Sequence, residues 1–258
     1  MSEKYEIITV DETNVDERGF FCYMSKRKSP GYQQKRAWLE ARFTEGMKIK
    51  ILHEIGGRDV GFIEYLPSEN AWRAVQAQDY LLIHCLWVVG KGKGKGYGSL
   101  LLQECLKDAH AQKKQGVLMV SSDRIWLAGK DIFLKNGFVE VDQVLPFRLL
   151  VYTFNSQTQP SFPTDWEDRQ KRFGTGLTVI RTPQCPYIEN GVAEVLQIAE
   201  ELGMPVKVVE FHSAQELQAQ SPSPFGVFGI VYEGKLLSYY FVKRSKFEKR
   251  LHELAEEG

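Results

Sequence analysis

An apolar run that opens directly into a glycine- and lysine-rich loop is the feature that most constrains the fold. Residues 80–89 are nearly all apolar, as is typical of a strand buried on both faces. Glycine then alternates with lysine over residues 90–96. A helix is predicted directly afterwards, because Leu101 and Cys105 begin an apolar stripe with helical spacing. This order of strand, glycine loop and helix predicts an α/β fold with a ligand site at the start of the helix.

The predicted ligand of this loop is a phosphate group. The first amides of a helix lack intrahelical partners, and the helix dipole adds partial positive charge at that end. A nucleoside triphosphate loop requires Ser or Thr directly after its last lysine, but Lys95 is followed by Gly96. The G-x-G-x-x-G spacing of dinucleotide-binding folds is also absent. A flexible solvated loop is the plain alternative, and the structured segments on both sides disfavour it.

The loop resembles the Q/R-x-x-G-x-G/A motif of the GNAT acetyltransferases. Residues 93–98 read Lys-Gly-Lys-Gly-Tyr-Gly, with Lys93 in the place of Gln or Arg. The resemblance implies that acetyl-CoA is the cosubstrate, with its pyrophosphate on the main chain of the loop and its thioester along the preceding strand. Gly96 and Gly98 are expected to let the diphosphate approach closely, because they lack a Cβ. The cofactor-binding residues implied in this way are Trp87, Val88, Lys93, Gly94, Lys95, Gly96, Tyr97, Gly98, Ser99 and Phe133.

A second signature lies further along the chain. Residues 131–138 resemble the helix-Gly-Phe stretch of the same family, often written F-Y-x-x-x-G-F. The resemblance covers residues 1–155 and implies an α+β fold with a mixed, mostly antiparallel sheet. Many members have a tyrosine here that protonates the leaving thiolate, but this chain has Phe133. Water, Ser121 or Ser122 are the candidate substitutes.

Transfer to an amine also requires a base, since a lysine-like amine has a pKa of about 10 and is mostly protonated at neutral pH. His84 is one candidate, because strict alternation along its strand places it on the same face as Leu86 and Val88. Glu64, near the end of the preceding strand, is the other. The alternatives are a histidine packed in the core and a glutamate with an exposed structural role.

The last third of the chain predicts a separate domain. Residues 156–176 contain prolines, serines and mixed charges without periodicity, which favours a linker. Residues 177–258 predict the order β-α-β-α-β-β-α. The strand, the Cys-Pro-Tyr-Ile turn at residues 185–188 and the following helix resemble a thioredoxin-like fold. Joined to a GNAT part, this domain looks like the YoaP-like C-terminal family.

The redox motif of that fold is incomplete in this sequence. Ile188 stands where a second cysteine would be, so a dithiol cycle within the motif is excluded. Cys185 remains as a possible monothiol redox residue, and an inherited thiol at a helix start is the alternative. By the same resemblance, Pro224 is expected to be a cis proline beside the thiol.

Composition limits the partners. Basic and acidic residues balance at 33 each in the 258-residue chain, so we expect no general nucleic-acid binding. No apolar run reaches about 18 residues and no secretory signal is recognisable, which predicts a cytoplasmic protein without a membrane partner. The four cysteines lack metal-like or C-x-x-C spacing, so reduced thiols and no metal are expected.

These observations leave two hypotheses. The first is an acetyl-CoA-dependent N-acetyltransferase that transfers the acetyl group directly to a small-molecule or peptide amine of unknown identity. The alternative is a CoA-binding scaffold with a monothiol redox module that uses Cys185. The acceptor is not fixed, because acceptor loops vary within one fold. A homodimer is possible.

Overall fold

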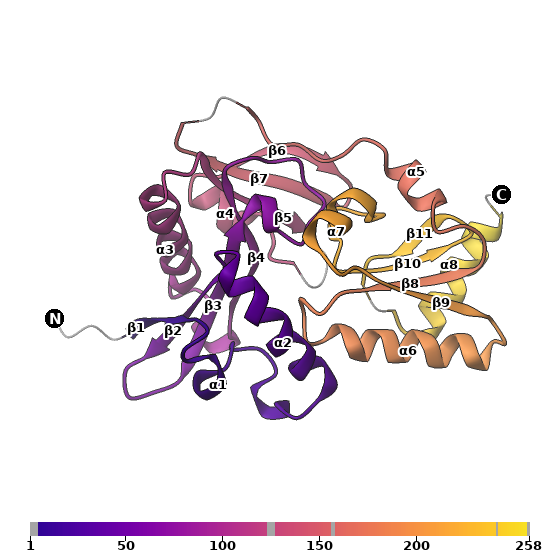
Figure 1. Ribbon diagram of the computed structural model, residues 1–258, viewed down its shortest axis with the longest axis horizontal. Helices are drawn as coiled ribbons and strands as arrows, with labels where there is room; N and C mark the ends of the chain where they lie inside the picture. The colour runs from indigo at the N-terminus through magenta and orange to yellow at the C-terminus, as the bar shows by residue number, and fades with distance from the viewer. Residues whose placement is uncertain (1–4, 123–126, 156–157, 241, 257–258) are drawn as a thin grey trace. The chain divides into compact units, whose positions relative to one another are not determined.

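The computed structural model describes residues 5–122, 127–155, 158–240 and 242–256 (Figure 1). The chain divides into two compact units. The first unit comprises Met1–Arg27, Arg36–Ala71 and Gln76–Phe162, and the second comprises Lys28–Lys35, Trp72–Val75 and Pro163–Gly258. The second unit therefore includes two short segments from the N-terminal half, which differs from the contiguous domains 1–155 and 177–258 expected from the sequence.

The first unit is built on a seven-stranded sheet with the order β1-β2-β3-β4-β5-β7-β6. Its strands are β1 (Tyr5–Val10), β2 (Lys48–Glu54), β3 (Asp59–Pro67), β4 (Tyr80–Val88), β5 (Gly116–Ser122), β6 (Val139–Val144) and β7 (Phe147–Thr153). β4 and β5 are parallel, and the other neighbouring pairs are antiparallel. The predicted mixed, mostly antiparallel sheet is confirmed.

The helix predicted directly after the glycine- and lysine-rich loop forms as α3. The helical elements that begin between β1 and β7 are α1 (Val15–Arg18), η1 (Met24–Lys26), α2 (Pro30–Thr44), η2 (Ser68–Asn70), η3 (Gly90–Gly92), α3 (Tyr97–Ala111) and α4 (Asp131–Lys135). α4 forms the helical part of the predicted helix-Gly-Phe stretch at residues 131–138.

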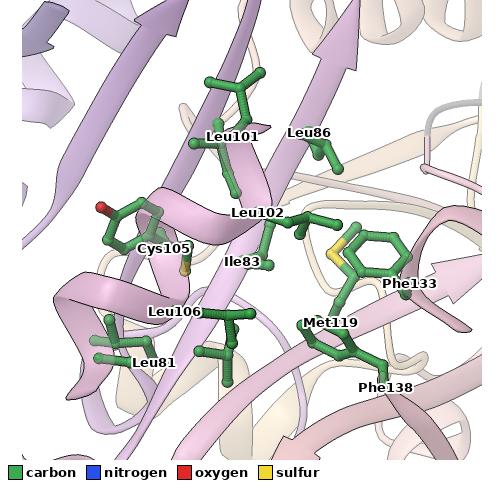
Figure 2. Packing of buried hydrophobic residues seen from close by; sticks show 14 of the residues in the cluster. Leu81, Ile83, Leu86, Leu101, Leu102, Cys105, Leu106, Met119, Phe133 and Phe138 are labelled. Carbon is green, nitrogen blue, oxygen red and sulfur yellow. The ribbon is translucent and has the colours of Figure 1, made fainter. Parts of the chain in front are cut away.

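The core of the first unit lies between α3 and one face of the sheet. Figure 2 shows Leu102 and Cys105 of α3 among the strand residues Leu81 and Ile83, and all four are buried. Because burial of a leucine or isoleucine side chain stabilises the fold by roughly 1.5–3 kcal/mol, this contact fixes the helix against β4. The start of α3 is thereby fixed beside the end of β4.

The second unit contains a four-stranded sheet with the order β11-β10-β8-β9. Its elements are α5 (Trp166–Lys171), β8 (Leu177–Arg181), α6 (Ile188–Glu201), β9 (Val206–Glu210), α7 (Ala214–Gln220), β10 (Phe228–Tyr232), β11 (Lys235–Ser238) and α8 (Arg244–Glu256). β8 and β9 are parallel, whereas β10 is antiparallel to both β8 and β11. From β8 onward the elements follow the predicted order, but α5 forms within the segment that was expected to be an irregular linker.

The N-terminal segments of the second unit pack on the turn that precedes α6. The buried ammonium of Lys35 donates a hydrogen bond to the carbonyl oxygen of Gln184 at 2.8 Å. The buried guanidinium of Arg73 donates to Oε1 of the same residue at 3.4 Å. Gly31 lies so close to Pro186 that an added Cβ would be 2.1 Å from its carbonyl oxygen. These contacts explain why the segments belong to the second unit.

We expect Gly31→Ala to lower the free energy of unfolding by about 1–3 kcal/mol, because backbone must move to admit the methyl group. Alanine is otherwise favoured over glycine in a helix by about 1 kcal/mol, so the sign of the change is diagnostic. Urea denaturation followed by circular dichroism measures it. Gly90→Ala is the matched control, since its added Cβ meets no atom within 4 Å. A stabilised Gly31→Ala protein would contradict this packing.

Candidate active site

The parallel pairing of β4 with β5 stops before either strand ends. Registered pairs run from Tyr80 with Gly116 to Ile83 with Met119. β4 nevertheless continues to Val88, and β5 continues to Ser122. Within the described part of the sheet, the two strands therefore separate after Ile83. A strand edge with unpaired main-chain groups can accept an extended ligand.

A β-bulge lies at the point of separation. On its other side β4 pairs with β3, and the register shifts between Glu64 opposite Cys85 and Tyr65 opposite Ile83. His84 is the extra residue of β4. A bulge interrupts alternation, so Ile83 and Leu86 both belong to the core under α3 (Figure 2). The prediction that His84 shares a face with Leu86 and Val88 was wrong for this reason.

The bulge turns His84 toward Glu64. The Nδ1 atom of His84 lies 3.3 Å from Oε1 of Glu64, and both side chains are almost fully buried. The ring of Trp38 lies 6.1 Å from the imidazole ring. The structure thus brings the two predicted catalytic residues together, and the exposed role considered for Glu64 is wrong. A carboxylate beside an imidazole can share or transfer a proton.

The lysine- and glycine-rich loop consists of hydrogen-bonded turns. Gly92 donates its amide to the carbonyl of Val89 at 2.8 Å, and Lys95 donates to Gly92 at 3.3 Å. Gly94 and Gly96 both have φ of 80°. This left-handed conformation favours glycine, which explains the glycines at these two positions. Gly96 is also the N-cap of α3.

The first amides of α3 have no acceptor from the protein among the described residues. The first hydrogen bond onto the cap is donated by Leu100 to the carbonyl of Gly96, at 3.1 Å. The amides without an acceptor belong to Gly96, Tyr97, Gly98 and Ser99. Such groups bind anions, because the helix dipole reinforces their partial positive charge.

Two further contacts hold the beginning of α3 against α4. The side-chain amide of Asn136 donates to the hydroxyl oxygen of Ser99 at 3.0 Å. A Cβ added to Gly98 would lie 2.3 Å from Cδ1 of Ile132. Gly98 thus has a packing reason to be glycine, beyond the close diphosphate approach expected from the sequence. An added Cβ at Gly96 meets nothing within 4 Å, so its conformation is the constraint there.

The remaining predicted cofactor residues differ in their surroundings. The indole of Trp87 is exposed, and the ammonium of Lys93 lies 5.4 Å from its ring centroid. Val88 packs against the core. Phe133 is fully buried and forms an edge contact with Phe138 at 5.3 Å (Figure 2 shows Phe133 within the cluster). Phe133 is therefore a core residue in this structure and does not reach the surface.

The proton donor for the leaving thiolate has no assigned side chain. Ser121 is buried, and its hydroxyl donates to the carbonyl of Ala128 at 2.7 Å. Ser122 is also buried. Water from the solvent remains the third candidate named from the sequence.

Glu54 is a site residue that sequence reasoning missed. The hydroxyl of Tyr97 donates to Oε1 of Glu54 at 2.8 Å, and the ammonium of Lys95 lies 3.5 Å from the same oxygen. The hydrogen bond from Tyr97, with the charge of Lys95, lowers the pKa of Glu54, and the same hydrogen bond raises the pKa of Tyr97. The sequence has no local signal for this contact, because 43 positions separate Glu54 from Tyr97.

Cys185 lies in the second unit. It is half-buried in the turn before α6, and its carbonyl accepts a hydrogen bond from Ile188 at 3.1 Å. Pro224 was expected to follow a cis peptide bond. That prediction was wrong, because the cis bond in the described ranges is Leu145–Pro146.

Two negative findings bear on other classes of site. The described residues contain no group of three or more His, Cys, Asp or Glu side chains that could hold a metal ion. None of their helices is long and apolar enough to span a membrane.

Comparison with known proteins identifies the class that this fold and site define. The model of the Acetyltransferase (GNAT) family matches residues 13–124. A protein of Bacillus subtilis (strain 168), named uncharacterized N-acetyltransferase YoaP, is 30% identical over 253 residues, which are 96% of this chain and 99% of that protein. The chain therefore belongs to the GNAT acetyltransferase family. It is an N-acetyltransferase that uses acetyl-CoA as donor.

Two more proteins show partial similarity. The L-methionine sulfoximine/L-methionine sulfone acetyltransferase of Pseudomonas paraeruginosa (strain DSM 24068 / PA7) is 30% identical over 78 residues, covering 30% of this chain and 43% of that protein. The PaiA N-acetyltransferase of Thermoplasma acidophilum, solved in complex with coenzyme A, is 14% identical, with a TM-score of 0.39. That likeness covers 58% of this chain and 99% of the solved one.

Gly96→Ala tests whether the left-handed cap matters for the cofactor. The substitution meets no neighbouring atom, so the strain of positive φ should cost about 1–2 kcal/mol of stability. If the main chain at residue 96 rotates to relieve this strain, the first amides of α3 change direction. We therefore expect coenzyme A to bind about three- to tenfold more weakly. Isothermal titration calorimetry measures this change.

Gly203→Ala serves as the control, because Gly203 also has positive φ and open surroundings but follows α6 in the second unit. It should lose similar stability and keep the affinity for coenzyme A. Equal affinity of the Gly96→Ala and Gly203→Ala variants for coenzyme A would show that the conformation of the Gly96 cap does not affect cofactor binding.

Proposed function

We propose that the first unit binds acetyl-CoA with the diphosphate on the amides at the start of α3. The observation that carries this proposal is the set of amides from Gly96 to Ser99, which lack a protein acceptor among the described residues. Lys93 and Lys95 add positive charge beside them, and both are exposed. The pantetheine arm would lie along β4, where the strand leaves β5.

The parts of the reaction that this chain must supply are proton removal and orientation. Acetyl-CoA brings an activated acetyl group, whose carbonyl a main-chain amide near Val88 would polarise. An ammonium acceptor must first lose a proton, because only the neutral amine has the lone pair that forms the new C–N bond. We assign this step to His84, with Glu64 orienting the imidazole and stabilising its protonated form.

Binding of the cofactor itself is tested by thermal unfolding. A ligand that binds only the folded state stabilises it by about 2.7 kcal/mol at one hundred times its Kd. We therefore expect the unfolding temperature to rise with the concentration of acetyl-CoA, and equally with coenzyme A. Adenosine lacks the diphosphate and should produce a much smaller rise. An unchanged midpoint at millimolar coenzyme A would contradict the proposed site.

Substitution of the buried pair should affect the rate and leave donor binding intact. We expect His84→Ala and Glu64→Gln to lower kcat about 10²- to 10⁴-fold with little change in the Kd for coenzyme A. In both variants the residual rate should rise with pH, because a larger fraction of the amine is then neutral. Release of free thiol from acetyl-CoA measures the rate.

His53→Gln is the matched control for this pair. His53 also contacts a carboxylate, Asp59, at 2.8 Å, but it lies at the far end of β2 and is partly exposed. The kcat of the His53→Gln variant should stay near that of the original protein. A His84→Ala enzyme with unchanged kcat would remove His84 from the mechanism.

The acceptor is proposed to be a small-molecule or peptide amine. The name of the Pseudomonas relative refers to amino acid derivatives with a free amine, so L-methionine sulfoximine and sulfone belong in the first substrate screen. Polyamines, aminoglycosides and short peptides complete the range of amines to compare. Formation of free CoA above the rate of spontaneous hydrolysis identifies the acceptor.

The second unit is proposed to have a thioredoxin-like fold without dithiol chemistry. This is supported by the parallel β8–β9 pair, the antiparallel β10 and the position of α6 directly after β8. Ile188, in the place of a second cysteine, is fully buried. No observation favours the redox alternative for Cys185. We also propose a cytoplasmic setting, since the described cysteines form no disulfide.

A further inference from the structure

The two lysines of the cofactor loop have different partners. Lys93 lies over the ring of Trp87 on β4, with 5.4 Å from the ammonium to the ring centroid. Lys95 lies 3.5 Å from Oε1 of Glu54 on β2 and 5.6 Å from the ring centroid of Tyr97. A carboxylate thus already interacts with one of the two charges that a diphosphate would use.

A single carboxylate oxygen connects the end of β2 to the beginning of α3. Glu54 is the last residue of β2, and Tyr97 is the first residue of α3. The Tyr97 hydroxyl donates to Oε1 of Glu54 at 2.8 Å, the oxygen that also pairs with Lys95. Tyr97 also makes an edge contact with Tyr5 of β1, at 6.3 Å between ring centroids. The first turn of α3 is therefore attached to two neighbouring strands.

Glu54 and Tyr97 each have a defined protonation state at neutral pH. The hydrogen bond from Tyr97, together with the nearby charge of Lys95, lowers the pKa of Glu54, so the carboxyl group is ionised. The same hydrogen bond raises the pKa of Tyr97, so the phenol keeps its proton and remains a donor. Glu54 thereby places a negative charge beside a loop whose ligand carries phosphates.

We propose that Glu54 is a positioning residue with two opposed effects on coenzyme A. Its hydrogen bond to Tyr97 orders the first turn of α3, which favours binding. Its negative charge competes for Lys95 and repels the phosphates, which weakens binding. This inference rests on the diphosphate site proposed above. Because acetyl-CoA and the product CoA carry the same phosphates, the second effect speeds product release.

The two effects can be separated by substitution. Glu54→Gln removes the charge but keeps a side-chain oxygen that can accept from Tyr97. Tyr97→Phe removes the hydrogen bond and leaves the carboxylate beside Lys95. Glu104→Gln is the matched control, because Glu104 pairs with Lys107 at 2.7 Å on the same helix, two turns beyond Tyr97.

The test is the affinity and dissociation rate of coenzyme A, measured by calorimetry and stopped flow. We expect Glu54→Gln to bind about three- to fivefold more tightly at low ionic strength and to release the ligand more slowly. The gain should vanish near 1 M salt, where the Debye length is only about 3 Å. Tyr97→Phe should bind about three- to fivefold more weakly at both salt concentrations. Glu104→Gln should leave both quantities unchanged.

The results distinguish this inference from the proposal on which it rests. If Glu54→Gln binds coenzyme A no more tightly than the original protein at low ionic strength while Gly96→Ala weakens binding, the site holds and the opposing charge effect is refuted. If none of these variants changes the affinity although coenzyme A binds, the diphosphate site itself is refuted. A purely structural Glu54 would give losses in stability without the salt-dependent gain.

Discussion

The early end of the β4–β5 pairing is the constraint on which the rest of the active site depends. Among the described residues, the register of β4 with β5 ends at Ile83 and Met119, although both strands continue. The bulge at His84 lies at this point, and bulges bend the strand that carries them. The same local irregularity turns His84 toward Glu64 and keeps Leu86 in the core. The one extra residue of this bulge therefore places His84 beside Glu64 and leaves Leu86 on the apolar face of β4.

Much of the first unit was predictable because its signals are local. The buried strand, the glycine loop and the helix each have a periodicity or a turn chemistry that short windows reveal. The positive φ of Gly94 and Gly96 accounts for the glycines at these two positions. The bulge at His84 was not predictable, since it arises from the register of β4 against β3. Alternation alone therefore assigned His84 to the wrong face.

Contacts between distant positions were also beyond the sequence. Nothing near Glu54 signals that Tyr97 and Lys95 will meet its carboxylate, although the lysines themselves were identified. α5 was missed because it has six residues, mostly charged or polar, and too few turns for a periodic pattern. The role of Gly98 was only partly understood, because its contact with Ile132 depends on how α4 packs.

The hydrogen bond between Lys35 and Gln184 joins residues 149 positions apart, both within the second unit. During synthesis, Lys35 leaves the ribosome long before its partner has been translated. At about 5–20 residues per second, roughly 7–30 s pass between the synthesis of Lys35 and that of the carbonyl that it binds. Ordered burial of this segment is therefore a late event in the maturation of the nascent chain.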